Sequence, residues 1–166
     1  MDTSLRDNNR SLLLELREQA TEIEFASFDT KPVVSFLREF SAPVKLNYQR
    51  EKEETQFIAR NDNDGFVRWD AMQTLWLAAF DDPMLEEAPC EVVQETAIEA
   101  LKAENAEQKL LRANMLSVPT ELYLLEQLSD IDLDRTLNQR DGLLRKLAID
   151  NQDTWLQLYD CLLYTS

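Results

Sequence analysis

The chain has 166 residues, 44% of them apolar, which is enough for one ordinary domain, or parts of two, with a hydrophobic core. With 32 acidic against 17 basic residues its formal charge is -15, and this negative field disfavours nucleic acid and anionic membrane surfaces as partners. No window approaches the roughly 20 consecutive apolar residues of a membrane span, and the polar segment 1–10 is unlike a signal peptide. We therefore expect a cytoplasmic protein without nucleic-acid or membrane partners.

The first part of the chain, residues 1–48, has the pattern of short β-strands. Apolar and polar residues alternate at 12–16, 21–25, 33–37 and 44–48, and Pro32 and Pro43 each stand at the beginning of a segment, where a missing N–H costs least. We predict three or four strands. A sandwich usually needs about seven, so this domain is expected to be an incomplete β-sandwich with open edges.

After Tyr48 the apolar period becomes that of helices. We predict a short helix over 51–60 and a turn over 61–65, whose Asn and Asp side chains cap backbone N–H groups. A strong helix over 66–80 follows, and Asp81, Asp82 and Pro83 end it. One stripe of this helix carries four large rings and one amide: Phe66, Trp69, Gln73, Trp76 and Phe80. We place Trp69 in the interior as an anchor of this helix.

Further helices are predicted over 90–104, over 107–116 and from Pro119 in a first turn to about 128. Asp130 and Asp132 offer caps for a long last helix, which Gly142 or the pair Asp150 and Asn151 would interrupt. Short connections imply antiparallel hairpins, and both a bundle and an α-solenoid fit them. The predicted fold class is mainly α, with an incomplete β-sandwich domain over 1–48 and a helical domain over 49–166.

The sequence lacks the residues of most catalytic sites. It has no histidine, which removes the usual general base and the usual zinc ligand, and Cys90 and Cys161 are too few and too far apart for a structural zinc site. Only two glycines are present, so no glycine-rich phosphate loop exists. We predict no catalytic, cofactor-binding or metal residue, and interpret both cysteines as reduced packing residues.

Two groups of acidic residues have weaker functional signals. The segment 62–65 fails as a calcium loop because its first and last ligand positions fall on Arg60 and Ala71, so capping is favoured. Carboxylate pairs such as Glu86 with Glu87, or Asp130 with Asp132, are expected by chance in so acidic a chain. We expect Glu86 to be an exposed charge, whose removal changes the free energy of unfolding by less than about 0.5 kcal/mol.

Two segments resemble a known family. The run 31–46, KPVVSFLREFSAPVKL, followed by 61–73, NDNDGFVRWDAMQ, is similar in order and spacing to the junction of the middle β-domain and the helical domain of M1 family zinc aminopeptidases, especially the bacterial alanyl aminopeptidases. Val67 and Asp70 depart from the family pattern, where Asn and Glu are usual. Arg68 and Trp69 match family positions, and we assign them to structure. Residues 161–166 do not continue the helix that the family leads us to expect.

The resemblance implies that the parent enzyme removes N-terminal residues from peptides with one zinc ion. The family's His-Glu-x-x-His and Gly-x-Met-Glu-Asn motifs do not occur here, so no site residue is carried over and no cofactor is expected in this chain. Its partners would be the catalytic domain of the parent chain and, through it, peptide substrates. The alternative is a free-standing acidic helical interaction module. The strand-like residues 1–48 favour the fragment, because an independent module has no use for open-edged strands.

Overall fold

A computed structural model describes residues 3–6, 11–24, 29–44, 46–82, 84, 86–101, 106–128 and 132–163. The chain divides into two compact units, Met1–Pro32 and Val33–Ser166. The predicted domain boundary after Tyr48 stays a prediction. None of the helices described is long and apolar enough to cross a membrane.

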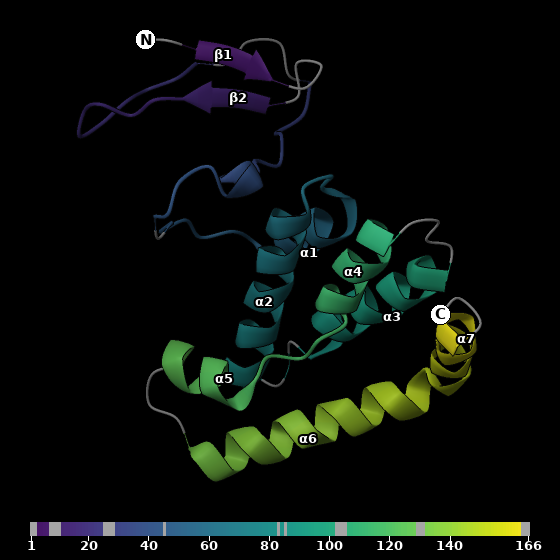
Figure 1. Cartoon of the computed structure of the whole chain (residues 1–166). Coiled ribbons are helices and arrows are strands. Elements are labelled where there is room, and N and C mark those ends of the chain that lie inside the picture. The colour runs from purple at the N-terminus through teal and green to yellow at the C-terminus, as the bar shows by residue number, and fades with distance from the viewer. Residues whose placement is uncertain are drawn as a thin grey trace. The chain divides into compact units, whose positions relative to one another are not determined.

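The first unit contains a β-hairpin (Figure 1). Strands β1 (Thr3–Arg6) and β2 (Ser11–Leu14) pair antiparallel, with Thr3 opposite Leu14 and Arg6 opposite Ser11. The other strands predicted over residues 1–48 are wrong for the described residues, because 21–24 in this unit, and 33–37, 44 and 46–48 in the second unit, form no strand. Phe25 and Lys45 lie outside those residues. Alternation alone is insufficient, because a strand also requires a neighbour whose backbone groups pair with its own.

The second unit is mainly α, as predicted. After a short 3₁₀ turn, η1 (Arg38–Phe40), come α1 (Lys52–Asn61), α2 (Gly65–Asp81), α3 (Glu87–Leu101), α4 (Ala106–Met115), α5 (Glu121–Gln127), α6 (Leu133–Asp150) and α7 (Gln152–Leu163). Figure 1 shows α1 and α2 side by side, and α6 as the long helix that leads into α7.

The helix boundaries follow from side-chain caps. The Asp64 carboxylate accepts the Val67 N–H at the start of α2, and Asp132 does the same for Arg135 at the start of α6, so both predicted caps are confirmed. Pro119 was expected in a first turn, but it precedes α5, whose cap is Thr120. Asp130 lies outside the described residues.

The two predicted interruptions of the last helix behave differently. Gly142 continues α6, and an added Cβ there would meet nothing within 4 Å. The helix is interrupted at Asn151, which confirms the predicted interruption at the pair Asp150 and Asn151. The side chain of Asn151 donates to the Leu147 carbonyl and competes there with the helical hydrogen bonds. Helix α7 then continues to Leu163, which corrects the expectation that the helical pattern fails after residue 160.

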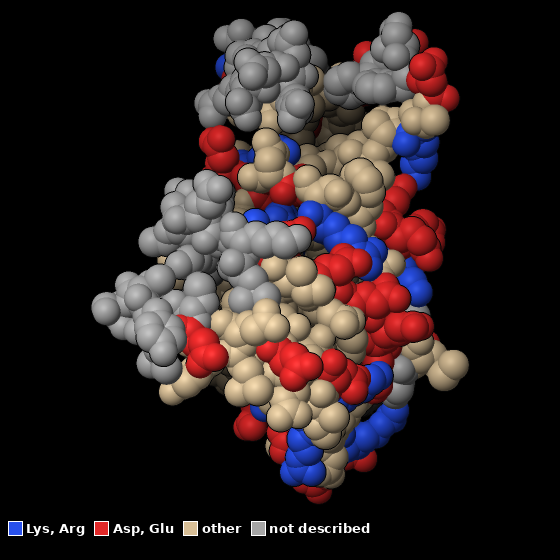
Figure 2. Space-filling view, turned by 90° about the vertical axis from the view of Figure 1, so that its right-hand side faces the viewer, with Lys and Arg blue, Asp and Glu red and all other residues tan. Residues whose placement is uncertain are grey.

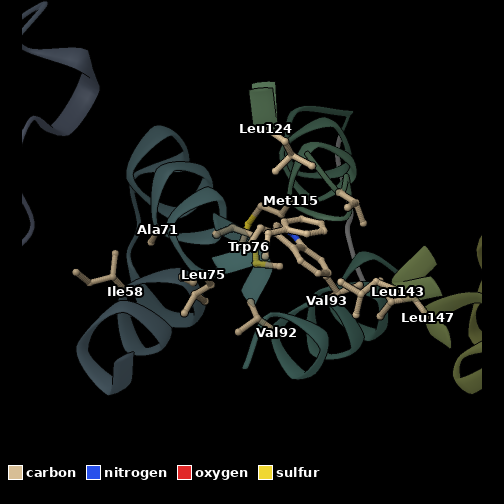
Figure 3. Packing of buried hydrophobic residues seen from close by; sticks show 14 of the residues in the cluster. Ile58, Ala71, Leu75, Trp76, Val92, Val93, Met115, Leu124, Leu143 and Leu147 are labelled. Carbon is tan, nitrogen blue, oxygen red and sulfur yellow. The ribbon is translucent and has the colours of Figure 1, made fainter. Parts of the chain in front are cut away.

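The core forms around the buried face of α2 (Figure 3). Trp76 and Met72 of α2 are fully buried there, together with Met115, at the end of α4. Leu143 and Leu147 bring α6 to the same cluster, and Figure 3 shows Trp76 at its centre with Met115 and Val93 close by. Of the buried residues in this cluster, the stripe contained only Trp76 and Phe80; besides Met72, Met115, Leu143 and Leu147, it lacked Ile58, Ala59, Val67, Ala71, Leu75, Val92, Val93, Val118 and Leu124.

Candidate functional site

Among the residues that the structure describes, no three His, Cys, Asp or Glu side chains are placed to hold a metal ion. Two of the carboxylates considered from the sequence, Asp132 and Glu86, have structural roles. Asp132 caps α6, and Glu86 accepts a hydrogen bond of 3.3 Å from Gln139 Nε2, which also donates to the Ala79 carbonyl at 2.9 Å. Gln139 thus links α6 both to α2 and to the turn before α3, where Glu86 is partly buried, so the expectation of a free exposed charge at Glu86 is wrong. The absence of site residues stays a prediction.

Much of the acidic charge lies on helix surfaces, where arginines partly compensate it. Figure 2 shows one face of the molecule, on which Asp and Glu side chains form a band with Lys and Arg beside them. Arg60 of α1 contacts Glu95 at 2.5 Å and Glu91 at 3.2 Å, and the hydrogen bond that Arg60 donates to Glu95 is the main reason why the pKa of Arg60 is raised. Such exposed pairs stabilise a protein by about 0 to 1 kcal/mol each, so they orient helices more than they hold the fold.

Arg68 joins three helices. Its Nε donates to the Ala59 carbonyl of α1 at 2.9 Å, and its guanidinium lies 3.6 Å from the Glu99 carboxylate of α3. Arg112 of α4 approaches the same carboxylate at 3.8 Å. This confirms the assignment of Arg68 to structure, as a guanidinium that carbonyls and carboxylates hold.

A pocket of about 360 Å³ opens beside the start of α2. It is lined by Gly65, Phe66, Trp69, Leu110, Leu111 and Asn114, which belong to α2 and α4. The two helices approach closely at Gly65, where an added Cβ would lie 3.0 Å from Leu111 Cδ1. Apolar and aromatic lining with one amide suits an apolar side chain or a small aromatic group.

The pocket changes the interpretation of Trp69. The sequence placed this ring in the interior, but it is only half-buried and lines the pocket, while Trp76 of the same helix is the ring at the centre of the core. The helical spacing of Trp69 and Trp76 places both rings on the same stripe of α2. Which end of the stripe is covered depends on where α4 and α6 cross α2, and periodicity does not contain that information.

A second cluster surrounds Arg50, which sequence reasoning missed. Its guanidinium lies 5.7 Å from the ring centroid of Phe36 and 5.2 Å from that of Tyr48, and it donates to the Val34 carbonyl at 3.3 Å. Partial burial raises the pKa of Asp70, although the residue as a whole is exposed, and the positive charge of Arg50 opposes this shift. Arg50 stands between an irregular segment and a helix, where no motif draws attention to it.

Known proteins identify the family. A family model described as "Domain of unknown function (DUF3458_C) ARM repeats" matches residues 52–165, which contain all of α1 to α7. The chain belongs to this ARM-repeat family. ARM repeats are stacked helices, so the α-solenoid is favoured over the bundle. A second model, described as "Domain of unknown function (DUF3458) Ig-like fold", matches residues 1–49, where the β-sandwich part is predicted.

Curated relatives of this ARM-repeat chain are named aminopeptidase N. The protein from Escherichia coli is 31% identical over 78% of this chain and 16% of its own length. The one from Haemophilus influenzae is 26% identical over 89% of this chain and 18% of its own length, and the one from Caulobacter vibrioides is 29% identical over 93% and 18%. The chain thus spans less than a fifth of these relatives, and the resemblance to M1 family aminopeptidases is confirmed.

A solved structure has the same fold. Legionella pneumophila aminopeptidase A, in a crystal structure with aspartic acid, superposes with a TM-score of 0.72 over 89% of this chain and 17% of that protein, at 21% identity. This ARM-repeat chain is therefore a segment of the kind found within much longer aminopeptidases.

Proposed function

We propose that this chain is a non-catalytic part of a cytoplasmic, zinc-dependent aminopeptidase, and that its helical unit helps to enclose the cavity in which the catalytic domain removes N-terminal residues from peptides. The observation that carries the proposal is the match to proteins named aminopeptidase N, over most of this chain but less than a fifth of theirs. The partners of the chain are then the catalytic domain and, through it, short peptides.

Zinc belongs to the parent enzyme in this proposal. The chain has no histidine, and the Cys90 thiol is half-buried with a pKa that burial raises, so it is a poor metal ligand at neutral pH. The residues of this chain do not fit a zinc site, and no catalytic step is assigned to them. Their contribution is shape, because a packed solenoid can exclude long or folded chains from a cavity that it borders.

The test is a chimera of Escherichia coli aminopeptidase N in which this chain replaces the matching segment. We expect the chimera to hold one zinc ion and to cleave an alanyl chromogenic substrate, whereas the isolated chain does neither. A version of the chimera without the segment should lose its preference for tripeptides over peptides of about 20 residues. A zinc-loaded chimera that cleaves long and short peptides with the same relative rates, with or without the segment, would contradict the enclosing role.

A second candidate is the free-standing acidic helical interaction module. The half-buried ring of Trp69 favours it, because this ring lines an apolar pocket open to solvent instead of anchoring the core. The coding sequence upstream of this chain distinguishes the two candidate functions. A His-Glu-x-x-His sequence in the upstream reading frame supports the enzyme part, and a start of translation at Met1 without such a region supports the module.

A further inference from the structure

The segment before α1 contains costly backbone. Leu37, Glu39 and Phe40 have φ of 56°, 56° and 52°, in the left-handed region that residues with a side chain rarely adopt. Such conformations persist only where the surroundings hold them, and they often mark places where a structure switches. We call residues 37–40 the strap. The contacts that keep the strap in this conformation therefore indicate its role.

Three residues before α2 hold the strap. The Arg38 guanidinium donates to Asp62 Oδ1 at 3.1 Å and to Asn63 Oδ1, while the Glu39 backbone N–H donates to Asp64 Oδ2 at 2.6 Å. All of these acceptors lie about 25 residues away in sequence. The strap is thus closed onto the start of α2 by hydrogen bonds, two of them to carboxylates, which are stronger than neutral ones.

Asp64 serves the strap and the helix at once. Its Oδ1 accepts the Val67 N–H at 2.9 Å and caps α2, while its Oδ2 holds Glu39. The residue is buried, and its own N–H donates to Asp62 Oδ1 at 2.8 Å, so the carboxylate is fixed in place. One carboxylate oxygen of Asp64 thus caps the helix, and the other binds the strap.

The strap also contacts a residue that lines the pocket between α2 and α4. The Phe40 ring packs edge-on against Phe66, with 5.1 Å between the ring centroids, and Phe66 lines the pocket. We propose that Asp64 is a latch that keeps the strap closed over Phe66, and that loss of its second oxygen releases the strap and uncovers this side of the pocket while α2 remains folded. The latch does not depend on the proposed enzymatic role of the parent.

Asp64→Asn separates the two tasks of this residue. Asparagine caps helices about as well as aspartate, but its amide has a single acceptor oxygen. If that oxygen accepts the Val67 N–H, the amide NH₂ faces the Glu39 N–H. Both groups are donors, so the hydrogen bond to the strap is lost. The matched control is Asp132→Asn, because the Asp132 carboxylate caps α6 in the same way through Arg135.

The measurement is limited trypsin digestion of the full chain, with the Arg38–Glu39 bond compared with the Arg17–Glu18 bond as an internal reference. Both are Arg–Glu bonds, but the Arg38 side chain is held by Asp62 and Asn63 and the Glu39 N–H by Asp64, whereas the Arg17 side chain is 75% exposed. In the wild-type chain we expect cleavage at Arg38 to be at least tenfold slower than at Arg17. Asp64→Asn should accelerate cleavage at Arg38 about tenfold with an unchanged helical circular dichroism signal, and Asp132→Asn should not.

Two results would overturn the latch: equal cleavage at both bonds in the wild-type chain, or an unchanged rate at Arg38 in Asp64→Asn. A general acceleration at both bonds with loss of helical signal would mean that Asp64→Asn unfolds α2 and no longer reports on the strap. Asn63→Ala, which leaves the Asp64 cap intact and removes one acceptor of Arg38, then tests whether these hydrogen bonds close the strap. It must accelerate cleavage at Arg38 selectively, and its failure to do so would refute the proposal.

Discussion

Replacing Trp76 by alanine tests the most consequential feature of the core. The indole ring is fully buried among residues of α2, α3 and α4, and Figure 3 shows it at the centre of the cluster. Truncating a buried Trp removes its transfer free energy and leaves a cavity, which together cost about 3 to 5 kcal/mol. Trp69 stands two turns earlier on the same helix, but its ring is half-buried at an open pocket, so Trp69→Ala should cost only about 1 to 2 kcal/mol.

Urea denaturation followed by circular dichroism measures both values. With an m-value of about 2 kcal/mol per M, Trp76→Ala should lower the midpoint by about 1.5 to 2.5 M and Trp69→Ala by about 0.5 to 1 M. Equal m-values in the variants are needed for this comparison, because a changed m-value would indicate an altered denatured state. A shift for Trp69→Ala as large as that for Trp76→Ala would refute the placement of the two rings.

Four further outcomes are expected. The purified chain should bind no stoichiometric zinc and should not cleave an alanyl chromogenic substrate, and one zinc ion per chain with turnover abolished by chelation would contradict this. Circular dichroism of residues 50–166 should be strongly helical, whereas a β-dominated spectrum would contradict the helical unit. Glu86→Ala should cost about 0.5 to 1.5 kcal/mol in thermal or urea unfolding, because it removes a partner of Gln139, and a loss near zero would mean that this hydrogen bond is irrelevant. Burial raises the pKa of the Cys90 thiol, so above about pH 8.5 the unfolded chain releases this proton first and stability should fall with rising pH; Cys90→Ala, with Cys161 replaced in both proteins, should remove that slope.

The sequence by itself determined most of the helical unit. The helices at 51–60 and 66–80 were predicted within one residue of α1 and α2, because apolar spacing and local caps are properties of neighbouring residues. Asp64 and Asp132 were recognisable as caps for the same reason, since each bonds an N–H three residues away. The family resemblance also came from linear order, in the runs 31–46 and 61–73.

Only the tertiary structure decided which residues of these elements meet. Arg38 and Asp62 are separated by 24 positions, and no local rule pairs them. Alternation over 33–37 predicted a strand, but pairing needs a neighbour, and this segment instead leads into the strap. The stripe on α2 likewise did not show that Trp76 is central while Trp69 lines a pocket. Local periodicity fixes the direction in which a side chain points, whereas burial depends on what the rest of the chain places there.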